Sequence, residues 1–382
     1  MKRLLAAVLL CSCLLAALVV GTGTGAAKPR VPTRIPAPRG FFGIDPQGTL
    51  TDEDAEYMKA GGIETVRWPL PWNGVQPTAH GPYNWAAFDP VVEVAARHGL
   101  KVLPFVYGTP SWIARKYTTL PVGSGRARAA WSKFLEACVQ RYGPGGEFWK
   151  LHAPGALPPP GSEPLRVIGR PLPVRSWQVW NEANFFYFAY PVSPHRYVKL
   201  LKIASPAIKR VDPRARVILS GLFGEPTAHG ARGMPAAKFL EAIYRTPGIK
   251  RYFDGIALHP YAAFASNLEE MTEALHEVTV ENHDRVPLYV TEMGWGSQND
   301  FQLDAFEQGI RGQVKQLRAA YGYLLENRNR LDLKQVYWFA WKDQKESCDF
   351  CDSVGLFREG ERFHPKPAWH AFVALTGGRA RP

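Results

Sequence analysis

The stretch Ser176-Trp-Gln-Val-Trp-Asn-Glu-Ala-Asn184 predicts a short buried strand that ends abruptly in two polar residues, Asn181 and Glu182. Its aromatic and β-branched residues are typical of strands. A carboxylate at the tip of a buried strand is unusual, because burial disfavours the charged form and raises the pKa of the acid. A proton donor that works near neutral pH needs such a raised pKa, so this strand end indicates a catalytic acid.

A second strand of the same kind lies about 110 residues later, in Pro287-Leu-Tyr-Val-Thr-Glu-Met-Gly-Trp295, and ends in Glu292. Six further apolar runs predict strands, which makes eight in all. The six begin at Phe41, Glu64, Lys101, Arg216, Phe253 and Gln335.

Between the strands, apolar residues recur at helical spacing, as in 88–95 and 197–208, with Pro194 in a first turn and Gly99 near a helix end. Repeated strand and helix units favour parallel pairing with right-handed crossovers. Eight units predict a single-domain (β/α)8 TIM barrel of the α/β class over residues 41–376. The Pro- and Gly-rich interval 143–173 is expected to be a surface excursion that affects which ligand fits the site.

The first residues have the layout of a secretory signal peptide, with Lys2 and Arg3 before an apolar run and small residues at 25–27. We therefore expect a signal peptide at 1–27, a basic Pro-rich linker at 28–40, a short tail at 377–382, and a secreted or cell-envelope location. A retained membrane anchor is the alternative for the apolar run.

The formal net charge is +12, but eight of the cations lie in the signal, linker and tail, which contain no acids. The remaining body therefore carries +4, and a basic patch for a polyanion such as nucleic acid is not expected there. Cys138 is expected to be a buried apolar filler. Cys348 and Cys351 form a Cys-x-x-Cys pair that favours a small disulfide over a redox centre or half of a zinc site.

The active site of such a barrel lies at the carboxyl ends of its strands. Those ends carry strong polar groups among tryptophans, which suits a sugar, because carboxylates perform the chemistry and indole faces cover the pyranose rings. The residues at these ends are Arg67, Trp68, Asn181, Glu182, His259, Tyr261, Glu292, Trp295, Trp338 and Trp341.

Trp-Asn-Glu182 and Thr-Glu292-x-Gly-Trp295 resemble the motifs of the retaining glycoside hydrolases of clan A, the cellulase-like superfamily. The stretches Thr65–Pro77, Gly81–Trp85 and Gly108–Trp112 resemble family 39 and, next to it, family 5. The likeness covers roughly residues 41–375.

The resemblance implies that Glu182 is the general acid/base and Glu292 the nucleophile. Asn181 would bind a sugar hydroxyl, Arg67 would keep Glu292 ionised, and His259 and Tyr261 would line the same subsite. Arg67 as a simple barrel salt bridge and His259 as a structural group are the alternatives. The remaining expected substrate contacts are Trp112, Trp295, Trp338 and Trp341, of which the last two cannot share one facing because they lie three apart.

The expected function is therefore a retaining O-glycosidase that acts on a glycoside or polysaccharide through a covalent glycosyl-enzyme. The alternatives are a transglycosylase with the same residues and a non-catalytic carbohydrate-binding barrel of the envelope. No metal and no cofactor are expected. The expected partner is a carbohydrate substrate, without nucleic acid and without membrane contact beyond the N-terminal segment, and the protein is expected to be a monomer.

Overall fold

The computed structural model describes residues 36–157, 165–299, 305–345, 348, 350–360 and 362–382. All of them belong to one compact unit. The predicted signal peptide and most of the predicted linker lie outside the described residues. None of the helices in the described part is long and apolar enough to cross a membrane.

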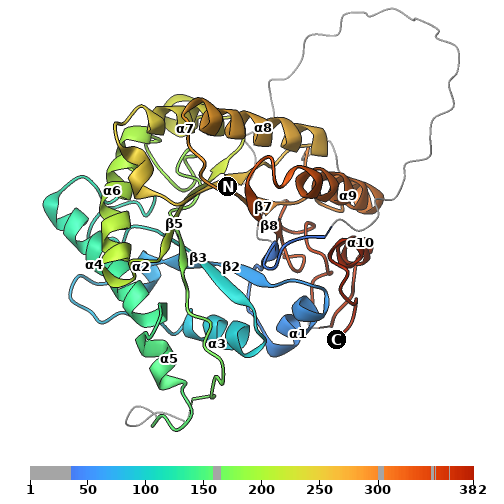
Figure 1. Ribbon diagram of the computed structural model, residues 1–382, viewed down its shortest axis with the longest axis horizontal. Coiled ribbons are helices and arrows are strands. Elements are labelled where there is room, and N and C mark those ends of the chain that lie inside the picture. The colour runs from blue at the N-terminus through green and yellow to red at the C-terminus, as the bar shows by residue number, and fades with distance from the viewer. Residues whose placement is uncertain (1–35, 158–164, 300–304, 346–347, 349, 361) are drawn as a thin grey trace, which may run out of the picture. The chain divides into compact units, whose positions relative to one another are not determined.

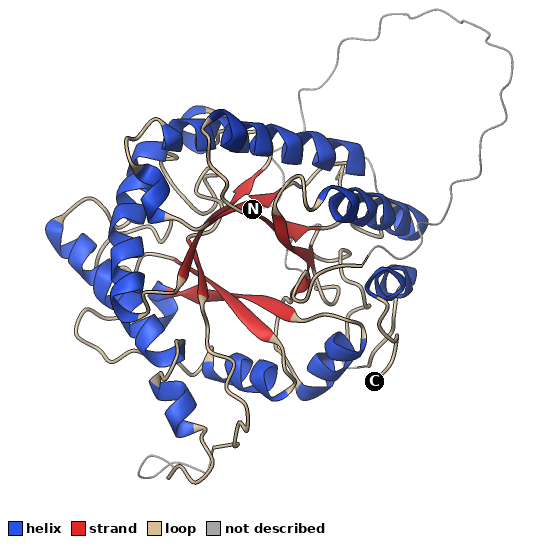
Figure 2. Ribbon diagram, in the orientation of Figure 1, coloured by secondary structure: helices blue, strands red, loops and turns tan. Residues whose placement is uncertain are grey.

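The strands form a closed barrel in which each strand pairs in parallel with the next and the eighth pairs with the first, as the sequence predicted. Figure 2 shows the strands as an inner ring with the helices around them. The strands are β1 (Phe42–Asp45), β2 (Thr65–Pro71), β3 (Lys101–Tyr107), β4 (Ser176–Val179), β5 (Arg216–Phe223), β6 (Gly255–His259), β7 (Leu288–Met293) and β8 (Leu333–Phe339).

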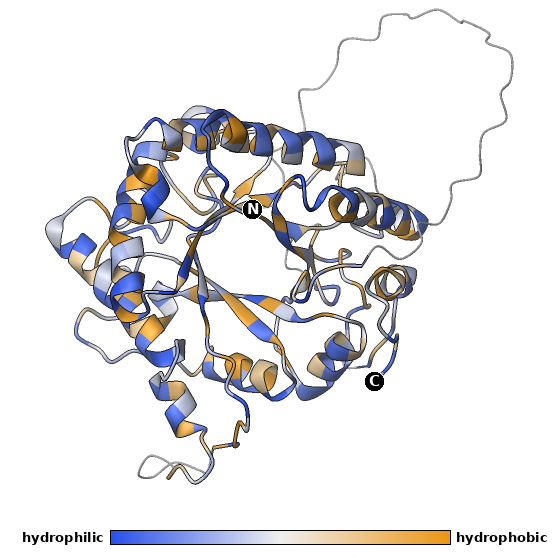
Figure 3. Cartoon of the chain, in the orientation of Figure 1, coloured by the Kyte–Doolittle hydropathy of each residue, from blue (hydrophilic) through white to orange (hydrophobic). Residues whose placement is uncertain are grey.

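The longer helices follow one another around the barrel in chain order (Figure 1). Hydrophobic residues recur along them between hydrophilic ones, as Figure 3 shows, so that one side of each helix can pack on the barrel. The α-helices are α1 (Asp52–Ala60), α2 (Trp72–Val75), α3 (Asp89–Arg97), α4 (Gly125–Tyr142), α5 (Glu147–Leu151), α6 (Pro194–Val211), α7 (Ala236–Tyr244), α8 (Ala265–Glu281), α9 (Gly309–Asn327) and α10 (Pro367–Thr376).

Local signals in the sequence set several helix ends. The Ser193 hydroxyl accepts from Arg196 N at the start of α6, and Pro194 occupies the first helical position, as predicted. Gly99 follows the cap of α3 with φ 71°, a conformation that glycine adopts without strain. The predicted filler Cys138 is free and buried in α4.

Alternation along the strands fills the barrel interior in two layers. Near the amino ends of the strands, an apolar and aromatic cluster closes the barrel; it consists of Leu103, Ile218, Ala257, Tyr289 and Tyr337. Further along, most of the inward side chains are polar or charged, including Arg67 on β2, Gln178 on β4, His259 on β6 and Thr291 on β7, whereas Phe105 on β3 and Phe339 on β8 are aromatic. The interior is therefore filled by apolar and aromatic side chains near the amino ends of the strands, and it carries most of its polar side chains near the carboxyl ends.

The interval 143–173 joins the end of α4 to the start of β4, so it begins and ends at the amino ends of the strands. Leu172 and Pro173 line a pocket there with Lys101 and Arg216, the first residues of β3 and β5. For the described residues, 143–157 and 165–173, the expectation that this excursion shapes the glycan site is therefore wrong, because none of them lines the cavity at the opposite end, and residues 158–164 lie outside the described residues. The loops that follow β3 and β4 take that position instead.

The residues at the two predicted domain boundaries contact the barrel. Gly40 N donates to the Glu64 carboxylate, and Ala37 packs on the core. At the other end, Arg379 N donates to Ala60 O, and Trp369 Nε1 donates to Ala380 O.

The contact between Gly61 and Trp369 provides a test of this packing. A Cβ at Gly61 would lie 2.0 Å from the Trp369 ring, whereas a Cβ at Gly322 in α9 meets nothing within 4 Å. Gly61→Ala should therefore lower the free energy of unfolding by about 1–3 kcal/mol. The control Gly322→Ala should raise it by up to about 1 kcal/mol, because alanine favours the helix. Urea unfolding measures both, and equal effects would contradict the packing described.

Candidate active site

A cavity of about 650 Å³ opens at the carboxyl ends of the strands. Four predicted site residues, Asn181, Glu182, Tyr261 and Glu292, lie on its surface. Its other walls are mainly aromatic and come from several strand ends and loops, including Trp68, Phe105, Tyr107, Tyr117, Tyr187, Phe188, Phe223, Phe306, Phe339 and Phe350. A few polar groups among apolar walls are the usual composition of a small-molecule site.

The backbone turns sharply at the tip of β4 to place Asn181 and Glu182. Trp180 and Glu182 have φ values of 75° and 38°, which non-glycine residues adopt at a cost of about 1–3 kcal/mol each. Hydrogen bonds to both neighbouring strands hold the turn, from Trp180 N to Val106 O and from Glu182 N to Gly221 O. The strain thus lies at the residues that the sequence motif singled out.

Arg67 lies fully buried beneath the cavity and binds four side chains. Its Nη1 donates to Asp45 Oδ2 at 2.5 Å and to Glu292 Oε1 at 2.6 Å. Its Nη2 donates to Asn181 Oδ1 at 2.6 Å, and its Nε to Gln178 Oε1 at 2.7 Å. The guanidinium also lies 3.9 Å from the centroid of the Phe105 ring. Because Asn181 Oδ1 faces Arg67, its amide nitrogen points elsewhere and can serve a ligand.

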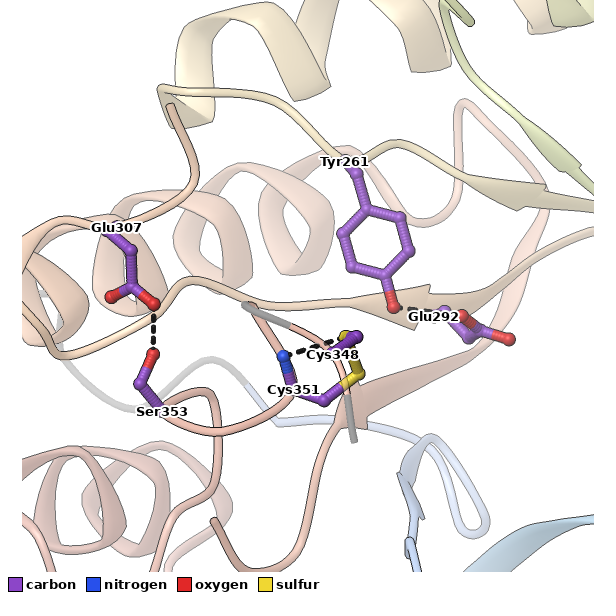
Figure 4. Close-up of a disulfide and its surroundings, with 6 residues drawn as sticks. All are labelled: Tyr261, Glu292, Glu307, Cys348, Cys351 and Ser353. Carbon is purple, nitrogen blue, oxygen red and sulfur yellow. Dashed lines mark hydrogen bonds between the residues drawn. A yellow bond between two sulfur atoms is a disulfide. The ribbon is translucent and has the colours of Figure 1, made fainter. Parts of the chain in front are cut away.

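Glu292 accepts a second hydrogen bond, from the Tyr261 hydroxyl to Oε2 at 2.8 Å. Figure 4 shows this hydroxyl directed at the carboxylate. Burial raises the pKa of Glu292, and Arg67 and Tyr261 oppose that rise. Burial also raises the pKa of Asp45, to about 8, against the attraction of Arg67.

Among the described residues, no arginine or lysine contacts Glu182. Burial raises its pKa well above the usual value, the charge of Glu292 raises it further, and Arg67 opposes the rise. Its Oε1 lies 2.8 Å from His259 Nδ1, and His259 Nε2 lies 2.9 Å from Thr291 Oγ1. Burial, followed by Arg67, lowers the pKa of His259, which favours the neutral ring.

His259 lies beneath the site because β5 leaves space for it. A Cβ at Gly221 would lie 1.8 Å from the imidazole, so only glycine fits there. Arg67 and His259 therefore support the two carboxyl groups from below, while Asn181 and Tyr261 lie beside them.

Atoms of Glu182, His259 and Glu292 lie within 4.8 Å of one another and could hold a metal ion, the group of this kind found among the described residues. However, Glu292 Oε1 already binds the Arg67 guanidinium. A divalent cation at this position would face that positive charge, so the donor set fits a metal poorly.

The four predicted tryptophan platforms lie elsewhere, and these expectations are corrected. Trp338 points out of the barrel because its neighbours Tyr337 and Phe339 point in, and its Nε1 donates to Val354 O. Trp295 is buried against Trp338, with its Nε1 bonded to Ala262 O.

The other two indoles also miss the cavity. Trp341 is buried beside Trp369, and its Nε1 donates to Asp54 Oδ1. Trp112 lines a separate pocket of about 280 Å³ that also contains Tyr83 and Arg126.

Several residues of the site were not predicted from the sequence. Asp45 ends β1 and could have been found by extending the strand-end rule to that strand. Gln178 and Thr291 are polar residues inside apolar strands, and their mutual hydrogen bond, at 3.2 Å, connects the surroundings of Arg67 to those of His259. Phe339 was not predicted, because its neighbour Trp338 was expected to be the substrate contact on that strand.

The disulfide between Cys348 and Cys351 is present, as predicted, and both residues border the cavity. It lies close to Tyr261 and Glu292 in Figure 4. Phe350 lies between the two cysteines in the chain. The centroid of its ring lies 5.4 Å from that of Tyr261 and 6.1 Å from that of Phe339. This loop therefore forms the cavity wall on the Glu292 side.

The Arg67 contacts yield a test of the site's electrostatics. Arg67→Met leaves Asp45 and Glu292 buried without a cation, so stability at neutral pH should fall by about 3–5 kcal/mol. Both pKa values should then rise further, so the loss should be smallest at low pH, where both carboxyls are already protonated in the wild type. It should grow as pH rises through the wild-type pKa values, of which that of Asp45 is about 8.

Denaturant unfolding at several pH values measures this dependence. The exposed Arg318→Met in α9 is the matched control and should change little at any pH. A loss for Arg67→Met that did not vary with pH would contradict the proposed electrostatics.

Comparisons with known proteins agree with the resemblance seen in the sequence. The family model for glycoside hydrolase family 42, described as beta-galactosidase, matches residues 46–142. None of the curated proteins matches the chain.

The fold is shared with several solved structures. A family 39 glycoside hydrolase from Bacteroides cellulosilyticus WH2 has a TM-score of 0.62 and 21% identity, with 88% of this chain and 63% of that chain covered. A GH39 beta-xylosidase from Caulobacter crescentus has a TM-score of 0.58 and 18% identity, with 90% and 72% covered. An exo-beta-1,4-mannosidase from an Opitutaceae bacterium, strain TAV5, has a TM-score of 0.60 and 13% identity, with 88% and 59% covered.

This chain thus spans less than two thirds of the length of the first of these structures. The identities are low, so the likeness itself concerns the fold. The solved structures thus show a barrel fold shared with glycoside hydrolases, and the family model that matches residues 46–142 also describes a glycoside hydrolase family.

Proposed function

We propose that the protein is a retaining O-glycosidase that cleaves a glycoside or polysaccharide by double displacement. The observation that carries the proposal is the pair Glu182 and Glu292. Both line one cavity, and a carboxylate oxygen of Glu182 lies within 4.8 Å of a carboxylate oxygen of Glu292. Retaining enzymes hold their two carboxyl groups about 5–5.5 Å apart, whereas inverting enzymes need about 6.5–9.5 Å. The short separation favours retention.

Glu292 is the proposed nucleophile. Arg67 and Tyr261 both stabilise its carboxylate against the effect of burial. It attacks the anomeric carbon, and the bond to the leaving oxygen breaks. Glu182, protonated because of burial and the nearby charge of Glu292, gives its proton to that oxygen.

The second step reverses the role of Glu182. Once Glu292 is esterified to the sugar it carries no charge, so one cause of the raised Glu182 pKa disappears. Glu182 then accepts a proton from water, and the water oxygen attacks the anomeric carbon and releases Glu292. The pair therefore alternates acid and base without an additional group.

His259 suits this alternation. Its neutral ring can donate from Nδ1 to the Glu182 carboxylate or accept from the protonated acid. Thr291 on the other side can both donate and accept, so it satisfies either tautomer. We therefore assign His259 as a positioning residue for Glu182, and Asn181 as a donor to the sugar hydroxyl.

We further propose that the enzyme acts outside the cytoplasm. The predicted signal peptide and the disulfide between Cys348 and Cys351 support this location, because disulfides persist in oxidising compartments.

Replacing each glutamate separates the two roles. Glu182→Gln should lower turnover of substrates with poor leaving groups by about 10²–10⁴-fold and spare activated aryl glycosides, whose leaving groups need no proton. Glu292→Gln should abolish the covalent intermediate. Mass spectrometry after reaction with 2-deoxy-2-fluoro glycosides should find the label on Glu292 of the wild type.

The exposed Glu56→Gln in α1 is the control and should keep full activity. Product analysis with an added sugar acceptor distinguishes hydrolysis from transfer. Hydrolysis that survived both active-site replacements together would refute the proposal.

Tyr261→Phe tests the electrostatics of the nucleophile. The hydroxyl stabilises ionised Glu292, so its removal should raise the pKa of that carboxyl. The acidic limb of kcat/KM, where Glu292 becomes protonated, should therefore move to higher pH. The basic limb, where Glu182 loses its proton, should move less. An acidic limb that stayed in place would exclude this role for Tyr261.

A further inference from the structure

The amino end of the barrel carries a second pocket, of about 490 Å³, on the side opposite the proposed active site. Its lining includes six cationic side chains and, among the described residues, no acid. The six are Arg39, Lys101, Arg175, Arg214, Arg216 and Lys334. The expectation that the folded part lacks a basic patch is therefore corrected at this end.

The six cations come from segments that are distant in sequence. Arg39 precedes β1, Lys101 begins β3 and Arg216 begins β5. Parallel strands bring their first residues to one end of the barrel. The cations therefore cluster there, although the net charge of the chain does not reveal this clustering. Arg39 was attributed to the linker, yet it lines this pocket.

Ion pairs neutralise only part of this charge. Arg175 pairs with Asp212, and Lys334 pairs with Asp332. The carboxylate of Glu64, also nearby, accepts from Gly40 N. Within the described part of the chain, no salt bridge engages the other four cations, which are Arg39, Lys101, Arg214 and Arg216.

The floor of the pocket carries hydroxyl groups. Thr65 and Tyr337 bond to each other through their hydroxyl groups, and Tyr289 lies beside them in the packed cluster at the amino end. Burial raises the pKa of Tyr289, and the positive charges of Arg216 and Lys334 oppose the rise, which places both cations near its hydroxyl. A concave site with like charges at its rim concentrates the electric field and attracts counterions.

We propose that this pocket binds a phosphoryl-bearing anion with two or more negative charges. Guanidinium and ammonium groups are the usual partners of phosphate oxygens, and arginine matches two of them at once. The pocket has the volume of a small-ligand site. The phosphoryl group can belong to a soluble ligand or to a lipid headgroup, and the chemistry of recognition is shared.

Calorimetry with the full chain tests the proposal, using tripolyphosphate as the soluble probe. We expect binding that weakens with added salt. The double variant Lys101→Gln/Arg216→Gln should weaken it by about tenfold or more, because two charged donors are removed. The matched control Lys199→Gln/Lys238→Gln removes two exposed cations from α6 and α7 and should leave binding unchanged.

Vesicle sedimentation identifies the source of the phosphoryl group. Binding to phosphatidylglycerol vesicles but not to phosphatidylcholine vesicles, lost in the pocket variant alone, assigns a headgroup. Binding of tripolyphosphate alone assigns a soluble ligand. The proposal is overturned if neither probe binds, or if the control variant loses as much as the pocket variant.

Hydrolysis at the opposite end should be unaffected by the pocket variant, and its melting temperature should match that of the control. This proposal and the proposed glycosidase activity can thus fail independently.

Discussion

The buried guanidinium of Arg67 is the interaction on which the site depends. It joins Asp45 of β1, Gln178 of β4, Asn181 beyond β4 and Glu292 of β7, and it stacks on Phe105 of β3. A cation without water is costly unless its donors are satisfied, and here each of its nitrogen atoms has a partner. The planar fork of arginine fixes the directions of these bonds, which a lysine could not reproduce.

This one cation also makes two chemically identical side chains unequal. Glu182 and Glu292 are both buried, and burial raises the pKa of each. Only Glu292 contacts the guanidinium and the Tyr261 hydroxyl, whereas Glu182 contacts a neutral histidine. The difference between the proposed acid and the proposed nucleophile therefore comes from neighbours on other strands, which the closed barrel brings into contact with them.

The sequence was informative where the signal is local. Strand periodicity and the Trp-Asn-Glu182 and Thr-Glu292 motifs located the barrel and its carboxyl pair, because the end of each strand can be recognised from its own residues. The tryptophans failed because an indole suits a sugar and a core equally well. Their facing depends on the parity of each strand, which puts Phe339 and not Trp338 inside.

Features assembled from distant segments were not predictable in the same way. The contacts of Asp45 and Gln178 with Arg67 require the closed barrel, and neither residue belongs to a conspicuous motif. The basic pocket was not predicted, because the net charge of the chain does not show where the cationic side chains lie in the fold. The excursion at 143–173 was expected near the site because of its length. Its position is instead decided by its place between a helix and the next strand, which puts both of its ends at the amino end of the barrel.

That position has a consequence for how the molecule can be extended. The chain leaves α4 and enters β4 at the end remote from the cleft, so a longer segment or a whole additional module inserted there would not obstruct substrate entry. The same point suits chemical attachment of the protein to a support, with the proposed active site facing the solution. An insertion at this junction therefore leaves the residues of the proposed active site unchanged.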